Sequence, residues 1–174
     1  LETIYGQGTA AYEVIHDANN PKLDNAIICA GGGGLTAGSC ISIKHINPQC
    51  NVFTAEPEEW NDHQLSFEKN ERVAMDINRG GLCDGLLTPT PGEIPFAINT
   101  HFGVKGLSAS DQAVCEAMRF AFNRLNLKLE PSGAVALACL LQHKERFRGS
   151  RTLVMLSGGN VDQKTFAECL AKAN

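Results

Sequence analysis

The sequence lacks several features that mark large classes of proteins. No apolar run approaches the roughly 20 residues that a helix needs to cross a bilayer, and no segment at the start resembles a signal peptide. No run of basic residues is present to follow a nucleic-acid backbone, and the formal net charge at pH 7 is −4. We therefore expect neither a membrane nor a nucleic acid as a partner, and we expect a cytoplasmic location.

The seven cysteines of the 174-residue chain form no C-x-x-C pair. Such pairs are typical of metal knuckles and of dithiol redox sites, so neither kind of site is expected. An odd number of widely spaced cysteines indicates buried free thiols in a reducing compartment. The length and the hydrophobic content of 43% are those of one domain with a substantial core.

What the sequence does have is a run of four glycines, Gly31–Gly34, between a predicted strand and a predicted helix. The apolar residues 25–30 are typical of a strand buried on both faces, and residues 36–46 are compatible with a helix. Glycines at such a joint leave backbone N–H groups exposed beside the positive end of the helix dipole. The segment therefore predicts an anion site, usually for a phosphate, and a plain tight turn is the alternative.

The rest of the chain alternates strands and helices. Further strands are predicted over residues 51–56 and 151–156, and further helices over residues 10–18, 58–70, 108–126, 134–142 and 162–172. Residues 6–9 are interpreted as a turn, residues 71–104 as loops with short pieces of structure, and residues 127–130 as a short strand or extended turn. Because strands joined by helices form parallel crossovers, we predict an α/β fold: a parallel sheet with helices on both faces.

A second glycine joint, Ser157-Gly158-Gly159-Asn160, follows the last predicted strand. In parallel sheets, ligands bind at the carboxyl ends of the strands, so the two joints could meet at one ligand. Ser157 would then offer it an uncharged hydroxyl group. The alternative role for Ser157 is a local turn or an N-cap before the last helix.

A dinucleotide-binding fold is a second interpretation of the same glycines. The segment Gly32–Ala37 fits the G-x-G-x-x-A pattern, and Glu56 ends the next predicted strand. A Rossmann fold places a ribose-binding acid at such a position. This interpretation would make the chain an NAD(P)-binding domain of an oxidoreductase, but it leaves the fourth glycine and the second joint unexplained.

Six short motifs occur in one order along the whole chain. They are Gly6-Gln7-Gly8-Thr9, Gly31–Gly34, Ala55-Glu56-Pro57, Asp84-Gly85, Glu130-Pro131-Ser132-Gly133-Ala134 and Ser157-Gly158-Gly159-Asn160. Together they resemble the C-terminal half of the serine/threonine dehydratases and serine racemase. These are pyridoxal-phosphate enzymes of fold type II, the tryptophan synthase β-like fold, so residues 1–174 resemble its large, cofactor-binding portion. The resemblance implies that the complete protein is an ammonia-lyase or an amino-acid racemase. It would convert a hydroxy amino acid such as serine or threonine to a 2-oxo acid and ammonia, with racemisation as a competing reaction.

The resemblance also implies roles for individual residues. The phosphate of pyridoxal 5′-phosphate would be bound by backbone N–H groups of Gly31, Gly32, Gly33, Gly34 and Leu35. Ser157 would hydrogen-bond the pyridine nitrogen, and Gly85 and Glu130 would lie beside the ring. A serine at that nitrogen does not hold it protonated as a carboxylate would, which suits loss of a β-hydroxyl group.

The serine racemase branch also binds a divalent cation next to its Ala-Glu-Pro turn. The matching residues here are Glu56, the backbone carbonyl of Trp60, and Asp62. Carboxylate and carbonyl oxygens are ligands that Mg²⁺ or Ca²⁺ prefers. The alternative is two solvated acids at the start of a surface helix.

The family attaches its cofactor to a lysine in a Ser-Phe-Lys-x-Arg-Gly type of motif, which this sequence lacks. Ser66-Phe67-Glu68-Lys69-Asn70 is only superficially similar, because its lysine comes one position late and no Arg-Gly follows. We therefore assign no catalytic residue and expect this chain alone to be inactive without the missing N-terminal half. A homodimer is expected from the family alone, and a non-catalytic module that keeps the fold is the third interpretation.

Overall fold

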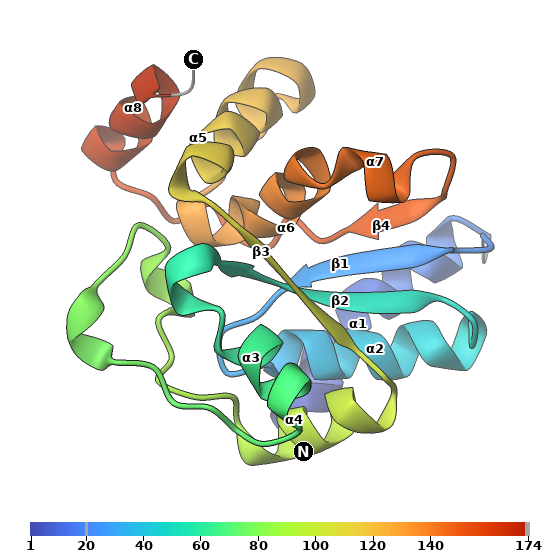
Figure 1. Ribbon diagram of the computed structural model, residues 1–174. Helices are drawn as coiled ribbons and strands as arrows, with labels where there is room; N and C mark the ends of the chain where they lie inside the picture. The colour runs from blue at the N-terminus through green and yellow to red at the C-terminus, as the bar shows by residue number, and fades with distance from the viewer. Residues whose placement is uncertain (20, 173–174) are drawn as a thin grey trace.

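The computed structural model describes residues 1–19 and 21–172 (Figure 1). Within them, four parallel strands form one sheet in the order β3-β2-β1-β4. The strands are β1 (Asn25–Cys29), β2 (Asn51–Pro57), β3 (Lys105–Ala109) and β4 (Thr152–Val154). The α-helices are α1 (Glu2–Asp17), α2 (Gly34–Ile46), α3 (Asp62–Lys69), α4 (Glu93–His101), α5 (Asp111–Phe120), α6 (Pro131–Gln142), α7 (Lys144–Phe147) and α8 (Gln163–Lys172).

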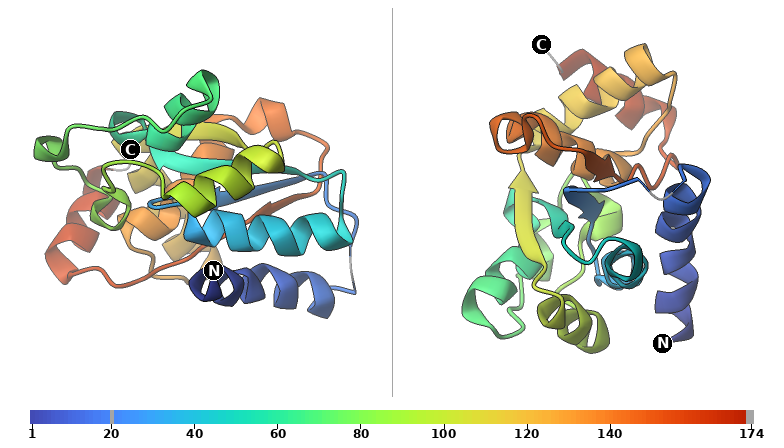
Figure 2. Two further views of the ribbon diagram at one scale, coloured as in Figure 1. Left: turned by 90° about the horizontal axis from the view of Figure 1, so that it is seen from below. Right: turned by 90° about the vertical axis from the view of Figure 1, so that its right-hand side faces the viewer.

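Helices cover both faces of the sheet, which confirms the predicted fold class (Figure 2). The core on one face joins α1 and α2 to β1 and β2, and the core on the other face joins α5, α6 and α8 to the sheet. All five residues of β1 are buried, as expected for a central parallel strand. This sheet brings the carboxyl ends of β1 and β4 side by side.

The prediction of a turn at residues 6–9 is wrong, because α1 runs through them. Gly8 serves the packing of α1 against α2 instead. A Cβ atom on Gly8 would lie 2.6 Å from the carbonyl oxygen of Gly38, and one on Gly38 would collide with the carbonyl oxygen of Ile4. Glycine at both positions lets the two helices approach closely, and this contact outweighs the poor helix propensity of glycine.

Residues 71–104 are loops with short pieces of structure, as interpreted, and α4 is the longest of these pieces. The strand β3, just beyond them, was not predicted. β3 is an edge strand with an exposed residue and two half-buried ones, and Leu107 is its one large apolar side chain. Such a strand shows little apolar periodicity in the sequence. The start of α5 is capped by a side chain, since the Ser110 hydroxyl accepts the N–H of Ala113 at 3.2 Å.

Several boundaries differ from those predicted. β4 ends at Val154, although Met155 still donates its N–H to Ile27 at 3.0 Å. α6 starts at Pro131, a residue suited to the first turn because its missing N–H has no helical partner there. The predicted helix over 58–70 is a 3₁₀ turn, Glu58–Trp60, followed by α3. The predicted helix over 108–126 is α5 followed by a π-helical turn, Ala121–Leu125, and residues 127–130 form no strand.

All seven cysteines are free and buried, as expected. Among residues 1–19 and 21–172, no helix combines the length and the apolar character needed to cross a bilayer.

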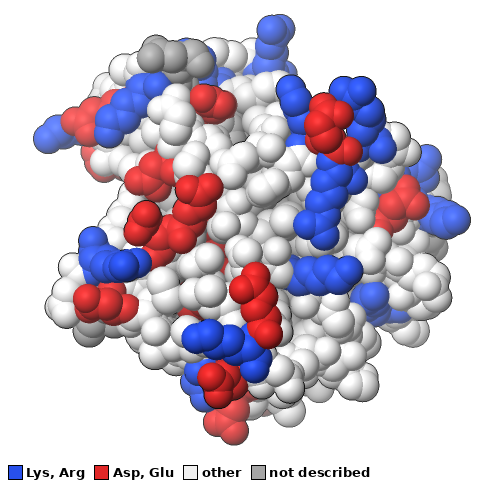
Figure 3. Space-filling view, in the orientation of Figure 1, with Lys and Arg blue, Asp and Glu red and all other residues white. Residues whose placement is uncertain are grey.

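Basic side chains gather over α7 on the face in Figure 3, with an acidic side chain among them. Arg148 and Glu145 form an exposed ion pair of 3.1 Å there.

The glycine contact between α1 and α2 predicts opposite effects for two alanine substitutions. Gly8→Ala should lower the free energy of unfolding by about 1–3 kcal/mol, because the methyl group has no room. Gly6→Ala should raise it by about 0.5–1 kcal/mol, because nothing lies within 4 Å of the added atom and alanine favours a helix. Equilibrium unfolding in urea measures both changes, and equal stability of the two variants would contradict this account of α1.

Candidate functional site

The glycine loop joins the end of β1 directly to the start of α2. Gly33 is the N-cap of α2, with φ = +87°, a left-handed conformation that glycine adopts without strain. No side chain caps this helix, so its first N–H groups have no partner from a capping residue. They and the helix dipole make this end of α2 suitable for an anion.

The expected cofactor residues surround a single cavity of about 350 Å³. The glycine loop and Leu35 form one part of its wall, Gly85 and Glu130 another, and Ser157 a third. These residues come from four segments that lie far apart in the sequence. The structure therefore brings all eight of them together.

Two glycines of the loop are not required by packing within the protein. A Cβ atom on Gly32 or Gly34 would meet no protein atom within 4 Å. Both residues line the cavity, so a side chain at either position would project into open space there. A ligand in the cavity that must approach the backbone closely explains why these two positions are glycine.

Ser157 is hydrogen-bonded to Cys29, which also lines the cavity. The Ser157 Oγ and Cys29 Sγ atoms lie 3.1 Å apart. Burial raises the pKa of the Cys29 thiol, so the thiol remains protonated near neutral pH and can donate to the serine oxygen. That arrangement leaves the serine proton free to be donated to a ligand.

The alternative role for Ser157 as a cap of the last helix is wrong. α8 begins at Gln163, and the Asp162 carboxylate accepts the N–H of Thr165 at 2.9 Å in its first turn. Sequence reasoning did not identify Cys29. A thiol in the last position of a buried strand gives no local sign of its partner, which lies 128 residues away.

Glu130 is held by the second glycine joint. Its backbone N–H donates to the Gly158 carbonyl at 3.0 Å, and its carboxylate accepts the N–H of Asn160 at 2.9 Å. A Cβ atom on Gly158 would collide with the Glu130 carboxylate. The glycine is therefore needed for this close contact.

Ser132 fixes Gly85 at the cavity wall. Its hydroxyl oxygen accepts the N–H of Gly85 at 3.0 Å, and both residues line the cavity. Sequence reasoning gave Ser132 no role, although it lies in the motif that includes Glu130. The sequence feature that could have indicated a role for Ser132 is its hydroxyl group, which stands in the first turn of an otherwise apolar helix.

Glu56 and Asp62 form a buried acidic pair, so the alternative of two solvated acids is wrong. The Glu56 carboxylate accepts the N–H of His63 at 2.7 Å and that of Gln64 at 2.9 Å. Neither carboxylate oxygen of Asp62 has a hydrogen-bond partner in the described part of the chain. Burial and then the charge of Asp62 raise the pKa of Glu56, and burial raises the pKa of Asp62 to about 7.

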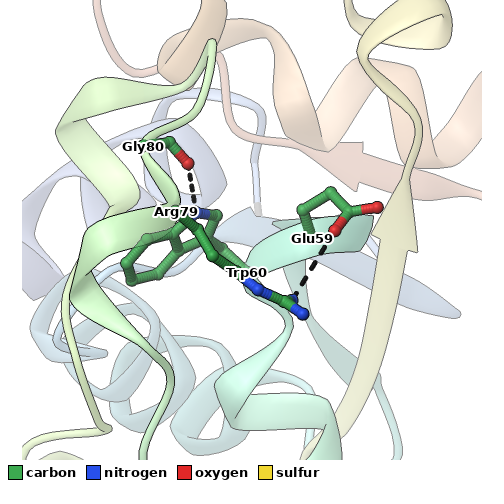
Figure 4. A network of polar contacts seen from close by, with 4 residues as sticks. All are labelled: Glu59, Trp60, Arg79 and Gly80. Atoms are coloured by element: carbon green, nitrogen blue, oxygen red, sulfur yellow. Dashed lines mark hydrogen bonds and ion pairs between the residues drawn. The ribbon is translucent and has the colours of Figure 1, made fainter.

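Trp60 lies between these two acids in the sequence, and its side chain is fixed by a contact with Gly80. The buried indole donates its Nε1–H to the Gly80 carbonyl at 2.6 Å, and Glu59 pairs with Arg79 at 3.6 Å (Figure 4). Within residues 1–19 and 21–172, no three His, Cys, Asp or Glu side chains are grouped to hold a metal ion. A cation here would therefore need the backbone carbonyl or water in addition to the two carboxylates.

The burial of Glu56 also decides against the dinucleotide interpretation. Both of its carboxylate oxygens accept backbone N–H groups of α3, and the side chain is fully buried. It cannot reach a ribose, as the acid of a Rossmann fold must. The alternative interpretation of the chain as an NAD(P)-binding domain is therefore wrong.

Comparison with known proteins agrees with the geometry. Residues 2–158 match the family model described as "Pyridoxal-phosphate dependent enzyme". The chain belongs to this family. Its cofactor is accordingly pyridoxal 5′-phosphate, and the cradle of glycines fits the phosphate of that group.

Similar proteins include racemases and ammonia-lyases. The chain is 35% identical to serine racemase of Schizosaccharomyces pombe over 96% of its own length and 51% of that protein. It is also 35% identical to L-threo-3-hydroxyaspartate ammonia-lyase of Saccharomyces cerevisiae over 98% of its length and 51% of that protein. The chain thus spans about half the length of these curated relatives.

Solved structures of this family have the same fold. Serine racemase from Dictyostelium discoideum is 34% identical and has a TM-score of 0.81, with 91% of this chain and 50% of that chain covered. The processed form of threonine deaminase isoform 2 from Solanum lycopersicum is 26% identical, with a TM-score of 0.90 and coverage of 98% and 50%.

The pyridoxal-phosphate family predicts an effect of filling the cradle at Gly34. Gly34→Ala should weaken binding of pyridoxamine 5′-phosphate at least about tenfold, because the methyl group blocks close approach to the N–H groups. The free energy of unfolding should not fall, because nothing in the protein lies near the added atom. Gly6→Ala is the control, since Gly6 is exposed and lies outside the cavity wall. Ligand fluorescence and urea unfolding measure the two quantities, and unchanged affinity in Gly34→Ala would contradict the assignment.

Proposed function

We propose that this chain is the cofactor-binding portion of an enzyme that removes the amino group of a hydroxy amino acid by β-elimination, with racemisation as a competing reaction. The observation that carries the proposal is the convergence of the glycine loop, Glu130 and Ser157 on one cavity. The substrate class follows the names of the relatives, which refer to serine, threonine or hydroxyaspartate.

The residues of the chain have distinct tasks in this proposal. Backbone N–H groups of Gly31–Leu35 hold the phosphate, and the dipole of α2 favours its charge. Gly85 and Glu130, which line the same cavity, would lie beside the ring. The bound cofactor supplies an electron sink for loss of a proton next to the amino group.

Ser157 sets the electronic character of that sink. Its hydroxyl group would donate a neutral hydrogen bond to the ring nitrogen, and the hydrogen bond with Cys29 would orient that hydroxyl. An uncharged partner would not keep the nitrogen protonated as a carboxylate does, which suits loss of a β-hydroxyl group.

The chain does not provide the covalent attachment of the cofactor. Among the described residues, no lysine lines the cavity, and Lys69 is exposed at the end of α3. The lysine that holds the cofactor and the groups that grip the substrate carboxylate belong to the N-terminal half in this proposal. We therefore expect the chain to bind the cofactor without turnover. From the resemblance to the family and the free cysteines, we expect the complete enzyme to be a cytoplasmic homodimer.

An activity assay tests this proposal directly. The protein is assayed with L-serine, L-threonine and L-threo-3-hydroxyaspartate, alone and together with a polypeptide that carries the family's lysine motif. We expect a 2-oxo acid and ammonia in equal amounts only from the combination, together with an absorption band of bound cofactor between about 300 and 500 nm. Bound cofactor without 2-oxo acid from the combination would favour the non-catalytic module.

A divalent cation at Glu56 and Asp62 is part of the proposal. Two buried carboxylates with unpartnered oxygens on Asp62 are unfavourable unless they bind a proton or a cation. Carboxylate oxygens and the carbonyl of Trp60 are ligands of the type that Mg²⁺ and Ca²⁺ prefer. The residues fit a cation with waters completing its coordination.

The raised pKa values make this cation effect depend on pH. Ca²⁺ should raise the midpoint of thermal unfolding at pH 8, where Asp62 is ionised, and raise it less at pH 6, where protons compete for the carboxylates. Asp62→Asn should abolish the shift, whereas Glu71→Gln, which changes an exposed acid just beyond α3, should retain it. No shift in the unaltered protein at pH 8 would exclude the cation site.

A further inference from the structure

His63 lies behind the glycine loop and is hydrogen-bonded to it. The residue is fully buried in the first turn of α3, and its Nε2 atom lies 2.8 Å from the carbonyl oxygen of Gly31. A carbonyl oxygen only accepts, so Nε2 carries the ring proton. Among the described residues, Nδ1 has no hydrogen-bond partner.

The next carbonyl of the loop is held in the same way. The Gly32 oxygen accepts the N–H of Gly92 at 3.0 Å. Neither His63 nor Gly92 lines the cavity, whereas Gly31–Gly34 all do. Two successive carbonyl groups of the loop are therefore held by partners outside the cavity.

This anchoring determines where the N–H groups point. In a trans peptide group the C=O and the following N–H point in opposite directions, and the described residues contain no cis peptide bond. Holding the carbonyls of Gly31 and Gly32 away from the cavity turns the N–H groups of Gly32 and Gly33 to the opposite side. These are two of the donors that the phosphate cradle requires.

The imidazole ring is itself fixed in place. The backbone N–H of His63 donates to Glu56 at 2.7 Å, and the ring packs against Phe67 with centroids 5.9 Å apart. On its other side, a Cβ atom on Gly33 would lie 2.5 Å from the ring atom Cε1. His63 therefore touches the loop at two points, a hydrogen bond to Gly31 and a contact with Gly33.

We propose that His63 is a positioning residue of the phosphate cradle, whose Nε2–H holds the Gly31 carbonyl so that the loop presents its N–H groups to the anion. The inference rests on the proposed function in one respect, namely that the anion is the phosphate of the cofactor. His63 contacts neither the cofactor nor the substrate in this role.

Substitutions at His63 separate the hydrogen bond from the packing. His63→Phe keeps a ring of similar shape without a donor, and His63→Gln restores an N–H near the Nε2 position. The matched control is His143→Phe, because His143 also bonds a backbone carbonyl through Nε2, that of Ser108 at 3.1 Å, outside the cavity wall. Each protein is titrated with pyridoxamine 5′-phosphate and with pyridoxamine, which lacks the phosphate.

We expect His63→Phe to weaken binding of the phosphorylated ligand about tenfold while binding of pyridoxamine stays the same. His63→Gln should recover affinity to within about threefold, and His143→Phe should match the unaltered protein. An unchanged ratio of the two affinities in His63→Phe would overturn the role of His63 and leave the proposed function intact. Failure of the unaltered protein to bind the phosphorylated ligand would instead overturn the proposed function.

A second measurement needs no substitution and so does not depend on a variant that folds. Nitrogen NMR of the protein with ¹⁵N-labelled histidine reports which ring nitrogen carries the proton. We expect the Nε2–H form of His63 with a slowly exchanging proton. The Nδ1–H form would overturn the inference.

Discussion

The backbone N–H groups at the joint of β1 and α2 are the feature on which the site depends. A helix without a side-chain cap leaves donors at its first turn without a partner from the protein. These donors and the positive end of the helix dipole favour an anion, so the loop suits a phosphate through its backbone geometry. The parallel sheet adds the second requirement, because it places the end of β4 and Ser157 beside the end of β1.

The remaining cavity residues are held by contacts between loops rather than by the sheet. Ser132 fixes Gly85, and the second glycine joint fixes Glu130. Each of these contacts joins segments far apart in the sequence, so the wall forms only when the domain has folded. A preorganised wall of this kind lowers the entropy lost when a ligand binds.

The sequence predicted the features that local chemistry determines. β1 and β2 were found because a central parallel strand is apolar along its whole length, and both glycine joints were found because glycine serves their backbone directly. α1 was truncated in the prediction because its glycines were interpreted as a turn, whereas a contact with Gly38 explains Gly8. β3 was missed because an edge strand buries few side chains.

The partners of the site residues could not be predicted for a related reason. Cys29 and His63 act through hydrogen bonds to residues 128 and 32 positions away, and a single sequence contains no sign of either pairing. The acidic pair was found from its resemblance to a family motif, but its burial became clear only in the fold.

The most direct test of this account is a crystal structure of the protein with pyridoxal 5′-phosphate bound. We predict phosphate oxygens within hydrogen-bonding distance of the N–H groups of residues 31–35, with the ring nitrogen facing the Ser157 hydroxyl. A phosphate bound elsewhere, for example at the basic side chains over α7, with the glycine loop empty, would contradict the central claim.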